Sequence, residues 1–336
     1  MGKIGVIGAG SWGTALSNLL AEKGNDVIMY DLNKDLLLEI ESDRENKRYL
    51  PGVSLSDNIS TTSDVEKAAA DKDVILFSVP AQHFRSALEA ALPYVKPNQI
   101  IVNVAKGIEQ KSLQTISQIA SSVNDNLRYV VLSGPSHAEE VGLKMPTTVS
   151  VASTDEDAAY FVQDLFITDR FRVYTNRDVL GLELGGSLKN IIALGAGISD
   201  GMGFGDNTKA ALMTRGIAEM IRLGVRMGAD RETFSGLAGI GDLIVTCTSV
   251  HSRNRRCGIM IGEGMDPKDA VNQVGMVVEG MFSAEAAYDL AKQLDVEMPI
   301  TEAIYKVIKG DMNAKTALSQ LMARPKRHEH EPLDVL

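Results

Sequence analysis

A glycine-rich loop directly follows an apolar segment near the start of the chain and constrains the fold more than any other feature. Segment Lys3–Ile7 is rich in β-branched residues, and Gly8, Gly10 and Gly13 then match the spacing G-x-G-x-x-G before a helix-like stretch, Thr14–Lys23. The first glycine allows a tight turn, the second lets the backbone approach a pyrophosphate, and the third lets helix and strand pack closely. The helix N-terminus then offers N–H groups to phosphates. This context favours a dinucleotide site over a glycine turn in an ordinary βαβ unit.

An acidic residue follows the second predicted strand, at about the distance from the loop that dinucleotide-binding units show. The predicted strand 26–31 ends in Asp31, and the next residues are Leu32, Asn33 and Lys34. A carboxylate there binds the adenine ribose 2′-hydroxyl of NAD and repels the 2′-phosphate of NADP. We therefore expect Asp31 to bind the cofactor and NAD to be preferred, with NADP use still possible because Lys34 partly offsets the charge. The alternative role for Asp31 is a cap on the following helix.

Composition bounds the class of protein. The chain has 336 residues and a net charge of −10, which suffices for two domains and argues against nucleic acid as the main partner. The only two cysteines, Cys247 and Cys257, show neither disulfide-framework nor metal-ligand spacing. The first predicted strand begins at residue 3, so we expect no signal peptide, and we expect that no apolar run approaches the length of a membrane span. We therefore expect a cytoplasmic protein without a metal.

Strand-like and helix-like segments alternate through the first half of the chain. The strands are expected at residues 3–7, 26–31, 74–79, 100–104, 129–132, 147–152 and 171–174, and the helices at 14–23, 36–48, 83–92, 112–121 and 156–166. Nearly continuous apolar strands separated by helices predict an α/β, Rossmann-type, doubly wound parallel sheet.

Strand signals stop near residue 178, and helical periodicity follows at residues 182–199, 208–227, 282–294, 300–308 and 314–322. The sequence therefore predicts a dinucleotide-binding domain at 1–180 and an all-helical substrate and catalytic domain at 181–323. The charged segment 324–336 contains two prolines and is expected to be a flexible tail.

Two segments fall at the carboxyl ends of predicted strands, where ligands bind in such sheets. Lys106 follows strand 100–104 and could hold an anion or a carbonyl oxygen, although an exposed lysine is the commoner situation. Gly134 and Ser136 follow strand 129–132. They could contact an anion or a ribose, or Ser136 could cap the next helix.

Lys189 lies in a helix-like stretch, residues 181–197, that is apolar and rich in small residues. Such a helix is expected to be buried, and a buried lysine is costly unless it has a partner or a function. Lys189 is therefore the best general acid/base candidate among the lysines. The alternative is a side chain that extends to solvent.

Three further segments are polar and rich in glycine or arginine. Asp242 lies in the tight segment 239–243, where an N-cap role is the local alternative. Ser252, Arg253 and Asn254 suit phosphate capture, because a guanidinium is a permanently charged planar fork. Their alternative is a solvated basic turn. Glu279, in segment 277–280, could equally be a helix-start acid.

These motifs occur together and in order, and in this set the chain resembles bacterial NAD(P)-dependent glycerol-3-phosphate dehydrogenases along nearly its whole length. The motifs are residues 8–13, 106–109, 134–136 with Ala138, 189–190, 239–242, 252–254 and 278–280. Many members carry an arginine shortly after the second strand, where this chain has Leu32. This departure argues against tight NADP binding.

The resemblance implies reversible hydride transfer between NAD(P)H and dihydroxyacetone phosphate, which gives sn-glycerol 3-phosphate for phospholipid synthesis, in a homodimer. It implies that Lys189 is the proton donor and acceptor and that Asp242 orients it. The implied substrate contacts are Lys106, Gly134, Ser136, Lys189, Asp242, Ser252, Arg253 and Asn254. The implied dinucleotide contacts are Ser11, Trp12, Lys106, Ala138, Arg253, Val277 and Glu279.

Two other functions fit parts of the pattern. One is a related two-domain dehydrogenase that acts on another phosphorylated or acidic substrate. The other is a non-catalytic NADH sensor that binds partners through its helices. The arginine-rich segment favours a phosphorylated substrate, and a buried Lys189 argues against a sensor, which needs no proton donor.

Overall fold

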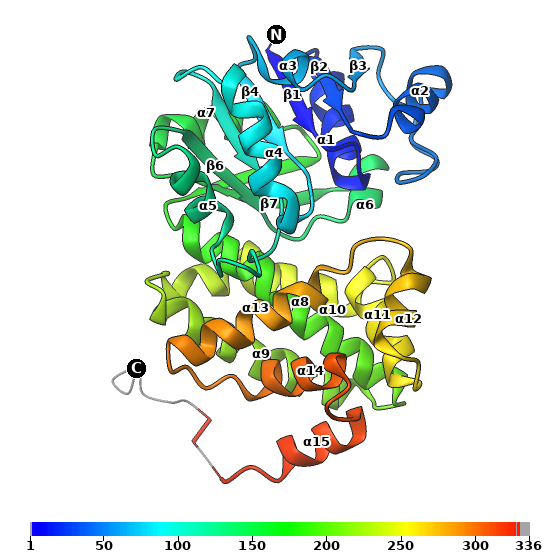
Figure 1. Ribbon diagram of the computed structural model, residues 1–336, viewed down its shortest axis with the longest axis vertical. Helices are drawn as coiled ribbons and strands as arrows, with labels where there is room; N and C mark the ends of the chain where they lie inside the picture. Colours follow the sequence, from blue (N-terminus) through cyan, green and yellow to red (C-terminus); the bar gives the residue numbers. More distant parts are fainter. Residues whose placement is uncertain (1, 327, 330–336) are drawn as a thin grey trace. The chain divides into compact units, whose positions relative to one another are not determined.

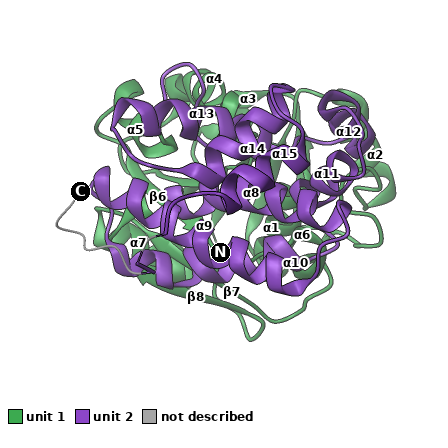
Figure 2. Ribbon diagram, turned by 90° about the horizontal axis from the view of Figure 1, so that it is seen from below, with its two compact units in different colours: residues 1–106, 114–183 green, residues 107–113, 184–336 purple. Residues whose placement is uncertain are grey.

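The computed structural model describes residues 2–326 and 328–329 and separates into two compact units (Figure 2). Unit 1 comprises residues 1–106 and 114–183, and unit 2 comprises residues 107–113 and 184–336. The sequence did not indicate that segment 107–113 joins unit 2. The domain limits at 180 and 323 stay predictions, and much of the expected tail at 324–336 lies outside the described residues.

Unit 1 is an eight-stranded sheet with helices between the strands. Its strands are β1 (Lys3–Ile7), β2 (Asp26–Tyr30), β3 (Ile59–Thr62), β4 (Val74–Phe77), β5 (Ile100–Asn103), β6 (Arg128–Ser133), β7 (Thr147–Ala152) and β8 (Phe171–Asn176). Its helices are α1 (Ser11–Glu22), α2 (Lys34–Asp43), α3 (Val65–Ala69), α4 (Phe84–Ala91), α5 (Ile116–Val123), α6 (Ala138–Gly142) and α7 (Glu156–Phe166), with short 3-10 turns at Ala81–His83 and Leu92–Tyr94.

The strand order is β3-β2-β1-β4-β5-β6-β7-β8, which confirms the predicted Rossmann-type doubly wound sheet. The expectation of an all-parallel sheet is wrong at one place, because β7 runs antiparallel to β6 while β8 runs parallel to β7. Strand β3 was missed because only Ile59 of its four residues is buried. The helices expected at 36–48 and 112–121 are shorter, ending at Asp43 and beginning at Ile116.

Alternate strand residues enter two apolar clusters, one on each face of the sheet. Val74 and Leu76 of β4 pack in a cluster with residues of α1, α2, α6 and α7. Ile75 and Phe77 pack in a second cluster with residues of α3, α4 and α5. Figure 1 shows these helices around the sheet. Because both faces are covered, all four residues of the central strand β4 are apolar and buried, and the ends of the strands are left for ligands.

The regular elements in the described part of unit 2 are all helices. Its helices are α8 (Val179–Gly201, whose first turn belongs to unit 1), α9 (Asp206–Arg226), α10 (Asp242–Thr248), α11 (Arg253–Gly262), α12 (Pro267–Val274), α13 (Glu279–Gln293), α14 (Pro299–Lys309) and α15 (Ala314–Met322), with a 3-10 turn at Arg231–Ser235 and a π-helical turn at Leu237–Gly241. The sequence indicated α8, α9, α13, α14 and α15 but not the shorter α10, α11 and α12.

The first turn of α8 is fixed within unit 1 by a buried carboxylate. Glu183 accepts hydrogen bonds from the Ser117 N–H at 2.8 Å, the Ser117 hydroxyl at 2.6 Å and the Tyr129 hydroxyl at 2.5 Å. Burial raises the pKa of Glu183, and the donors partly oppose this shift. The same acid thus supports the N-terminus of α5 and the beginning of α8.

Helices α8 and α11 lie unusually close together because glycines line both sides of their contact. A Cβ on Gly197 or Gly201 of α8 would lie 2.1 Å from a carbonyl oxygen of α11. A Cβ on Gly258 or Gly262 of α11 would lie 2.2 or 2.3 Å from a carbonyl oxygen of α8. Any side chain at these four positions would separate the helices. The glycines therefore place the N-terminus of α11 next to α8.

Helix α8 is also long and apolar enough to cross a membrane by length and composition, so the expectation that no segment of the chain reaches this length is wrong. Of its most apolar 18-residue window, 83% is buried within the protein. This burial is typical of a core helix.

A buried glutamate caps α14 from a neighbouring helix. Glu219 of α9 is 1% exposed and accepts hydrogen bonds from the N–H groups of Ile300 and Thr301, at 2.6 and 3.0 Å, and from the Thr301 hydroxyl at 3.0 Å. These N–H groups lie in the first turn of α14, where the helix itself offers no acceptor. Burial raises the pKa of this carboxyl to about 7, although the three donors lower it.

We predict that Glu219 makes the protein less stable as pH rises. In the unfolded chain the pKa of this carboxyl returns to its ordinary value of 4.5, so between 4.5 and about 7 the native state holds a proton that the unfolded state has released. The unfolding free energy contributed by this group therefore falls over that range, by about 2 to 3 kcal/mol between pH 5 and pH 8. Denaturant unfolding of the wild type and of Glu219→Gln across this range measures the difference.

The matched control is Glu232→Gln, which changes an exposed glutamate of the same unit. Its pH profile should parallel that of the wild type, whereas the profile of Glu219→Gln should be flatter. Parallel profiles for all three proteins would contradict the role of Glu219.

Candidate active site

The glycine loop has the geometry of a pyrophosphate cradle. Gly8 follows β1 with φ +110°, and a Cβ on Gly13 would lie 2.0 Å from the Gly8 carbonyl oxygen. A Cβ on Gly10 would meet no protein atom within 4 Å, so open space lies beside the loop there. Ser11 and Trp12 begin α1 and are half-buried next to this space. The residues present therefore fit a dinucleotide at this loop.

Asp31 lies directly after β2 and binds the loop. Its carboxylate accepts hydrogen bonds from the Ala9 N–H at 3.0 Å and the Asn33 N–H at 2.9 Å. The alternative role as a cap of α2 is wrong, because the Asn33 side chain caps that helix by accepting from the Leu36 N–H at 3.1 Å. Each carboxylate oxygen has a second lone pair, so Asp31 retains capacity for a ribose hydroxyl.

Lys106, Gly134 and Ser136 come together at the same edge of the sheet. Strands β1, β2, β4, β5 and β6 are parallel, so their carboxyl ends share one edge. The Gly134 carbonyl there accepts hydrogen bonds from Lys106 Nζ and from the Ser136 hydroxyl, both at 2.9 Å. The N-cap position of α6 is His137, so the expectation that Ser136 caps this helix is wrong. Ala138 is the first residue of α6.

A buried ion pair forms the second part of the candidate site, within unit 2. Lys189 Nζ of α8 pairs with the Asp242 carboxylate, and the two side chains are 7% and 1% exposed. Lys189 also donates to the Thr246 hydroxyl at 2.7 Å, and this hydroxyl donates to the Asp242 carbonyl at 2.6 Å. Both alternatives are wrong here: Lys189 does not extend to solvent, and Asp242 lies inside the first turn of α10 without acting as its N-cap.

Thr246 is the member of this cluster that the sequence reasoning missed. It lies four residues after Asp242, so the two side chains share one face of α10. That spacing could have indicated it, had the helix itself been recognised.

Asn254 is already bound to protein groups on both sides. Its Nδ2 donates to Asn190 Oδ1 at 2.9 Å, and its Oδ1 accepts from the Gly280 N–H at 2.8 Å. The side chain thus joins α8, α11 and the first turn of α13. The Ser252 hydroxyl is likewise engaged, as the N-cap of α11, accepting from the Arg255 N–H at 3.2 Å.

The N-terminus of α11 nevertheless suits an anion. Arg253 and Asn254 occupy its first two positions, at the positive end of the helix dipole. The half-buried Arg253 adds a permanent charge at this end. Val277 is exposed, and Glu279 is the first residue of α13, so the expected helix-start position of this acid is correct.

The two cysteines take no part in this chemistry. Cys247 and Cys257 are fully buried, and burial raises the pKa of their thiols to about 12 and about 11. Both thiols are therefore protonated and unreactive in the native protein.

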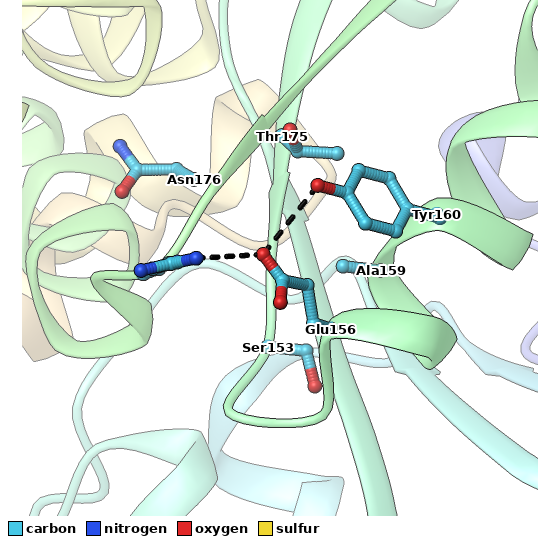
Figure 3. A pocket seen from close by; sticks show the side chains of 7 residues that line it. Ser153, Glu156, Ala159, Tyr160, Thr175 and Asn176 are labelled. Atoms are coloured by element: carbon cyan, nitrogen blue, oxygen red, sulfur yellow. Dashed lines mark hydrogen bonds and ion pairs between the residues drawn. The ribbon is translucent and has the colours of Figure 1, made fainter.

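A separate pocket of about 220 Å³ lies elsewhere in unit 1 (Figure 3). Its lining residues are Ser153, Glu156, Ala159, Tyr160, Thr175, Asn176 and Arg177. Glu156 accepts from Arg177 at 2.8 Å and from the Tyr160 hydroxyl at 3.4 Å, so the charged groups of the pocket pair with each other. The pocket lies at the carboxyl ends of β7 and β8, on the edge opposite the glycine loop, because β7 is antiparallel to β6. It contains none of the predicted site residues.

Comparison with known proteins places the chain in a family. Residues 3–159 match the family model of the N-terminus of NAD-dependent glycerol-3-phosphate dehydrogenase, and residues 178–319 match the model of its C-terminus. Curated proteins named glycerol-3-phosphate dehydrogenase (NAD(P)+) are similar along their whole length. The protein of Pelotomaculum thermopropionicum is 54% identical, covering 98% of this chain and 95% of that protein. The protein of Bacillus subtilis is 53% identical, covering 99% and 97%.

The fold agrees with this assignment. The crystal structure of glycerol-3-phosphate dehydrogenase from Coxiella burnetii matches with a TM-score of 0.92 at 37% identity, over 96% of this chain and 99% of that chain. The glycine loop, the helical unit and the similarity along the whole sequence lead to one conclusion: the chain belongs to the family of NAD-dependent glycerol-3-phosphate dehydrogenases.

Proposed function

We propose that this protein is an NAD(P)-dependent glycerol-3-phosphate dehydrogenase that interconverts dihydroxyacetone phosphate and sn-glycerol 3-phosphate. The observation that carries the proposal is the buried cluster of Lys189, Asp242 and Thr246 in a chain of this family. Burying a cation and an anion costs several kcal/mol per ion, and such a pair seldom stabilises a fold over apolar residues. A role in storing and delivering a proton explains the presence of the buried pair better than a role in stability.

In this mechanism Lys189 delivers a proton to the C2 oxygen of the ketone and takes it back in the reverse direction. The nicotinamide, when bound, supplies or accepts the hydride. Negative charge develops on the C2 oxygen during reduction, and the Lys189 ammonium stabilises that charge. Asp242 and Thr246 hold the ammonium in place through the hydrogen bonds described above, so little reorganisation is needed.

Other residues would position the reactants. We assign the phosphate of the substrate to Arg253, to the first N–H groups of α11 and to Ser252 and Asn254, with Lys106, Gly134 and Ser136 as further contacts. We assign the cofactor to Gly8, Gly10, Ser11, Trp12, Gly13, Asp31, Lys106, Ala138, Arg253, Val277 and Glu279. Binding energy from the phosphate, remote from the reacting carbon, can then serve orientation.

Asp31 and Leu32 support a preference for NADH. The Asp31 carboxylate can accept a hydrogen bond from the ribose 2′-hydroxyl and would repel a 2′-phosphate. Leu32 is 82% exposed and offers no charge to compensate. We further propose a homodimer in the cytoplasm that supplies the backbone for phospholipid synthesis; two buried, unreactive cysteines fit a reducing compartment.

One prediction of the proposed function concerns substrate class and cofactor. The protein should consume NADH with dihydroxyacetone phosphate, because the α11 N-terminus and Arg253 bind its phosphate. With unphosphorylated dihydroxyacetone we expect kcat/KM to fall by about 100-fold, the loss of roughly 3 kcal/mol of transition-state binding. Loss of NADH absorbance measures both rates, and NADPH in place of NADH should be used at least about tenfold less efficiently.

Each alternative function has its own outcome in this assay. Turnover of a keto acid or sugar acid in preference to the phosphorylated ketone would favour a related dehydrogenase. Binding of NADH without turnover of any ketone would favour a sensor. Equal use of NADH and NADPH would leave the activity in place and contradict the role of Asp31.

A further prediction of the proposed function concerns Lys189. Replacing it with alanine removes the proton donor, so turnover should fall by about 10²–10⁴-fold while NADH affinity stays within about twofold. The change also leaves Asp242 buried without its cation, which should lower stability by about 3–5 kcal/mol. Rates should therefore be compared on folded protein after a thermal melt.

Lys268→Ala, an exposed lysine of the same unit, is the matched control and should keep full turnover. Near wild-type turnover of folded Lys189→Ala would remove Lys189 from the mechanism.

A further inference from the structure

The residue between the first two loop glycines is held by side chains at both of its backbone polar groups. The Ala9 N–H donates to Asp31, and the Ala9 carbonyl accepts from Asn46 Nδ2 at 2.9 Å. Ala9 itself is fully buried. Asp31 was singled out from the sequence, whereas Asn46 lies in the irregular segment between α2 and β3 and belongs to none of the motifs.

Every polar group of the Asn46 amide has a partner, and these partners fix its orientation. Nδ2 donates to the Ala9 carbonyl and, at 2.8 Å, to the Thr14 hydroxyl of α1. Oδ1 accepts from the Tyr49 N–H at 3.1 Å. The side chain is 0% exposed. If the Asn46 amide were flipped, its Oδ1 would face the Ala9 carbonyl, and two acceptors would oppose each other. Only the observed orientation of the amide therefore satisfies all its hydrogen-bonding groups.

This hydrogen bond determines where the next N–H points. In a planar trans peptide the carbonyl and the following N–H point in opposite directions. Asn46 draws the Ala9 carbonyl into the interior, so the Gly10 N–H is turned away from the interior. Gly10 is the loop residue beside which a Cβ would meet no protein atom within 4 Å.

We propose that Asn46 is a positioning residue of the dinucleotide loop: its amide fixes the Ala9–Gly10 peptide so that the Gly10 N–H faces the pyrophosphate of the cofactor. The inference rests on the proposed function, since it assumes that NADH binds at this loop. Asn46 acts through the backbone and contacts neither the cofactor nor the reacting atoms.

Asn46→Asp tests this with almost no change of shape. The new carboxylate faces the Ala9 carbonyl and favours a reversed peptide, whose carbonyl would then oppose the pyrophosphate. We expect the Kd for NADH to rise by at least about tenfold, and KM for NADH likewise, with kcat at saturating NADH within about twofold. Trp12 is the only tryptophan of the chain and lies in the first turn of α1, two residues after Gly10, so its fluorescence reports NADH binding directly.

Asn25→Asp is the matched control. Asn25 is 7% exposed, donates to the Leu20 carbonyl at 2.9 Å and accepts from the Gly2 N–H at 2.9 Å. It lies near the amino end of β1, whereas the glycine loop follows the carboxyl end. The same substitution there should lower thermal stability without changing the Kd for NADH.

Asn46→Ala separates positioning from packing and serves if the aspartate variant does not fold. It removes the donor without adding a repulsion, so we expect a smaller rise in Kd, about threefold, but a larger loss of thermal stability because it leaves a cavity. A packing role predicts that the alanine variant has the weaker NADH binding of the two, and that order would overturn the proposal.

The outcomes distinguish the proposal from the function on which it rests. Unchanged NADH affinity in folded Asn46→Asp or Asn46→Ala, beside a wild type that binds NADH, overturns the role of Asn46 alone. A wild type that does not bind NADH overturns the proposed function as well. A raised Kd in both Asn46 variants, greater for aspartate, with Asn25→Asp unchanged, supports the proposal.

Discussion

The buried pair of Lys189 and Asp242 is the interaction on which the design of unit 2 depends. An ammonium and a carboxylate that are 7% and 1% exposed need partners at fixed positions, since an unpaired buried charge costs several kcal/mol. The partners come from α8 and α10, and Thr246 completes them. The glycine contacts between α8 and α11 serve the same region, because they place the N-terminus of α11, our proposed phosphate site, beside the helix that carries Lys189. Close helix packing therefore supports the same region as the buried ion pair.

The corresponding requirement in unit 1 is the orientation of a few peptide planes in the glycine loop. The apolar strands of unit 1 fix the sheet. The glycine loop after β1 borders open space at Gly10, where no protein atom packs against it. Asp31 and Asn46 provide that control from two later segments of the chain, each by a single hydrogen bond to Ala9. A loop rich in glycine is permissive in conformation. The side chains of Asp31 and Asn46, which bind the backbone of the loop, therefore select its single conformation.

Much of the fold follows from local patterns, and the failures have physical reasons. Apolar runs such as Val74–Phe77 and the glycine spacing after Ile7 predict strands and loop because burial on both faces leaves a continuous signal. Strand direction leaves no such signal, so the reversed β7 could not be predicted. Helix α10 has only seven residues and follows a π-helical turn, and its absence from the prediction also hid Thr246. Asn46 makes its contacts with Ala9 and Thr14 across more than thirty residues of sequence. No local pattern encodes that contact.

Chemical rescue of Lys189→Ala tests the central claim, that Lys189 transfers a proton, most directly. Small primary amines added to the variant should restore part of the turnover of dihydroxyacetone phosphate, in proportion to amine concentration, because they replace both the charge and the proton. Tetramethylammonium has the same charge and no proton to give. The account predicts rescue by methylamine or ethylamine and none by tetramethylammonium. Equal rescue by both would contradict it and would reduce Lys189 to a fixed positive charge.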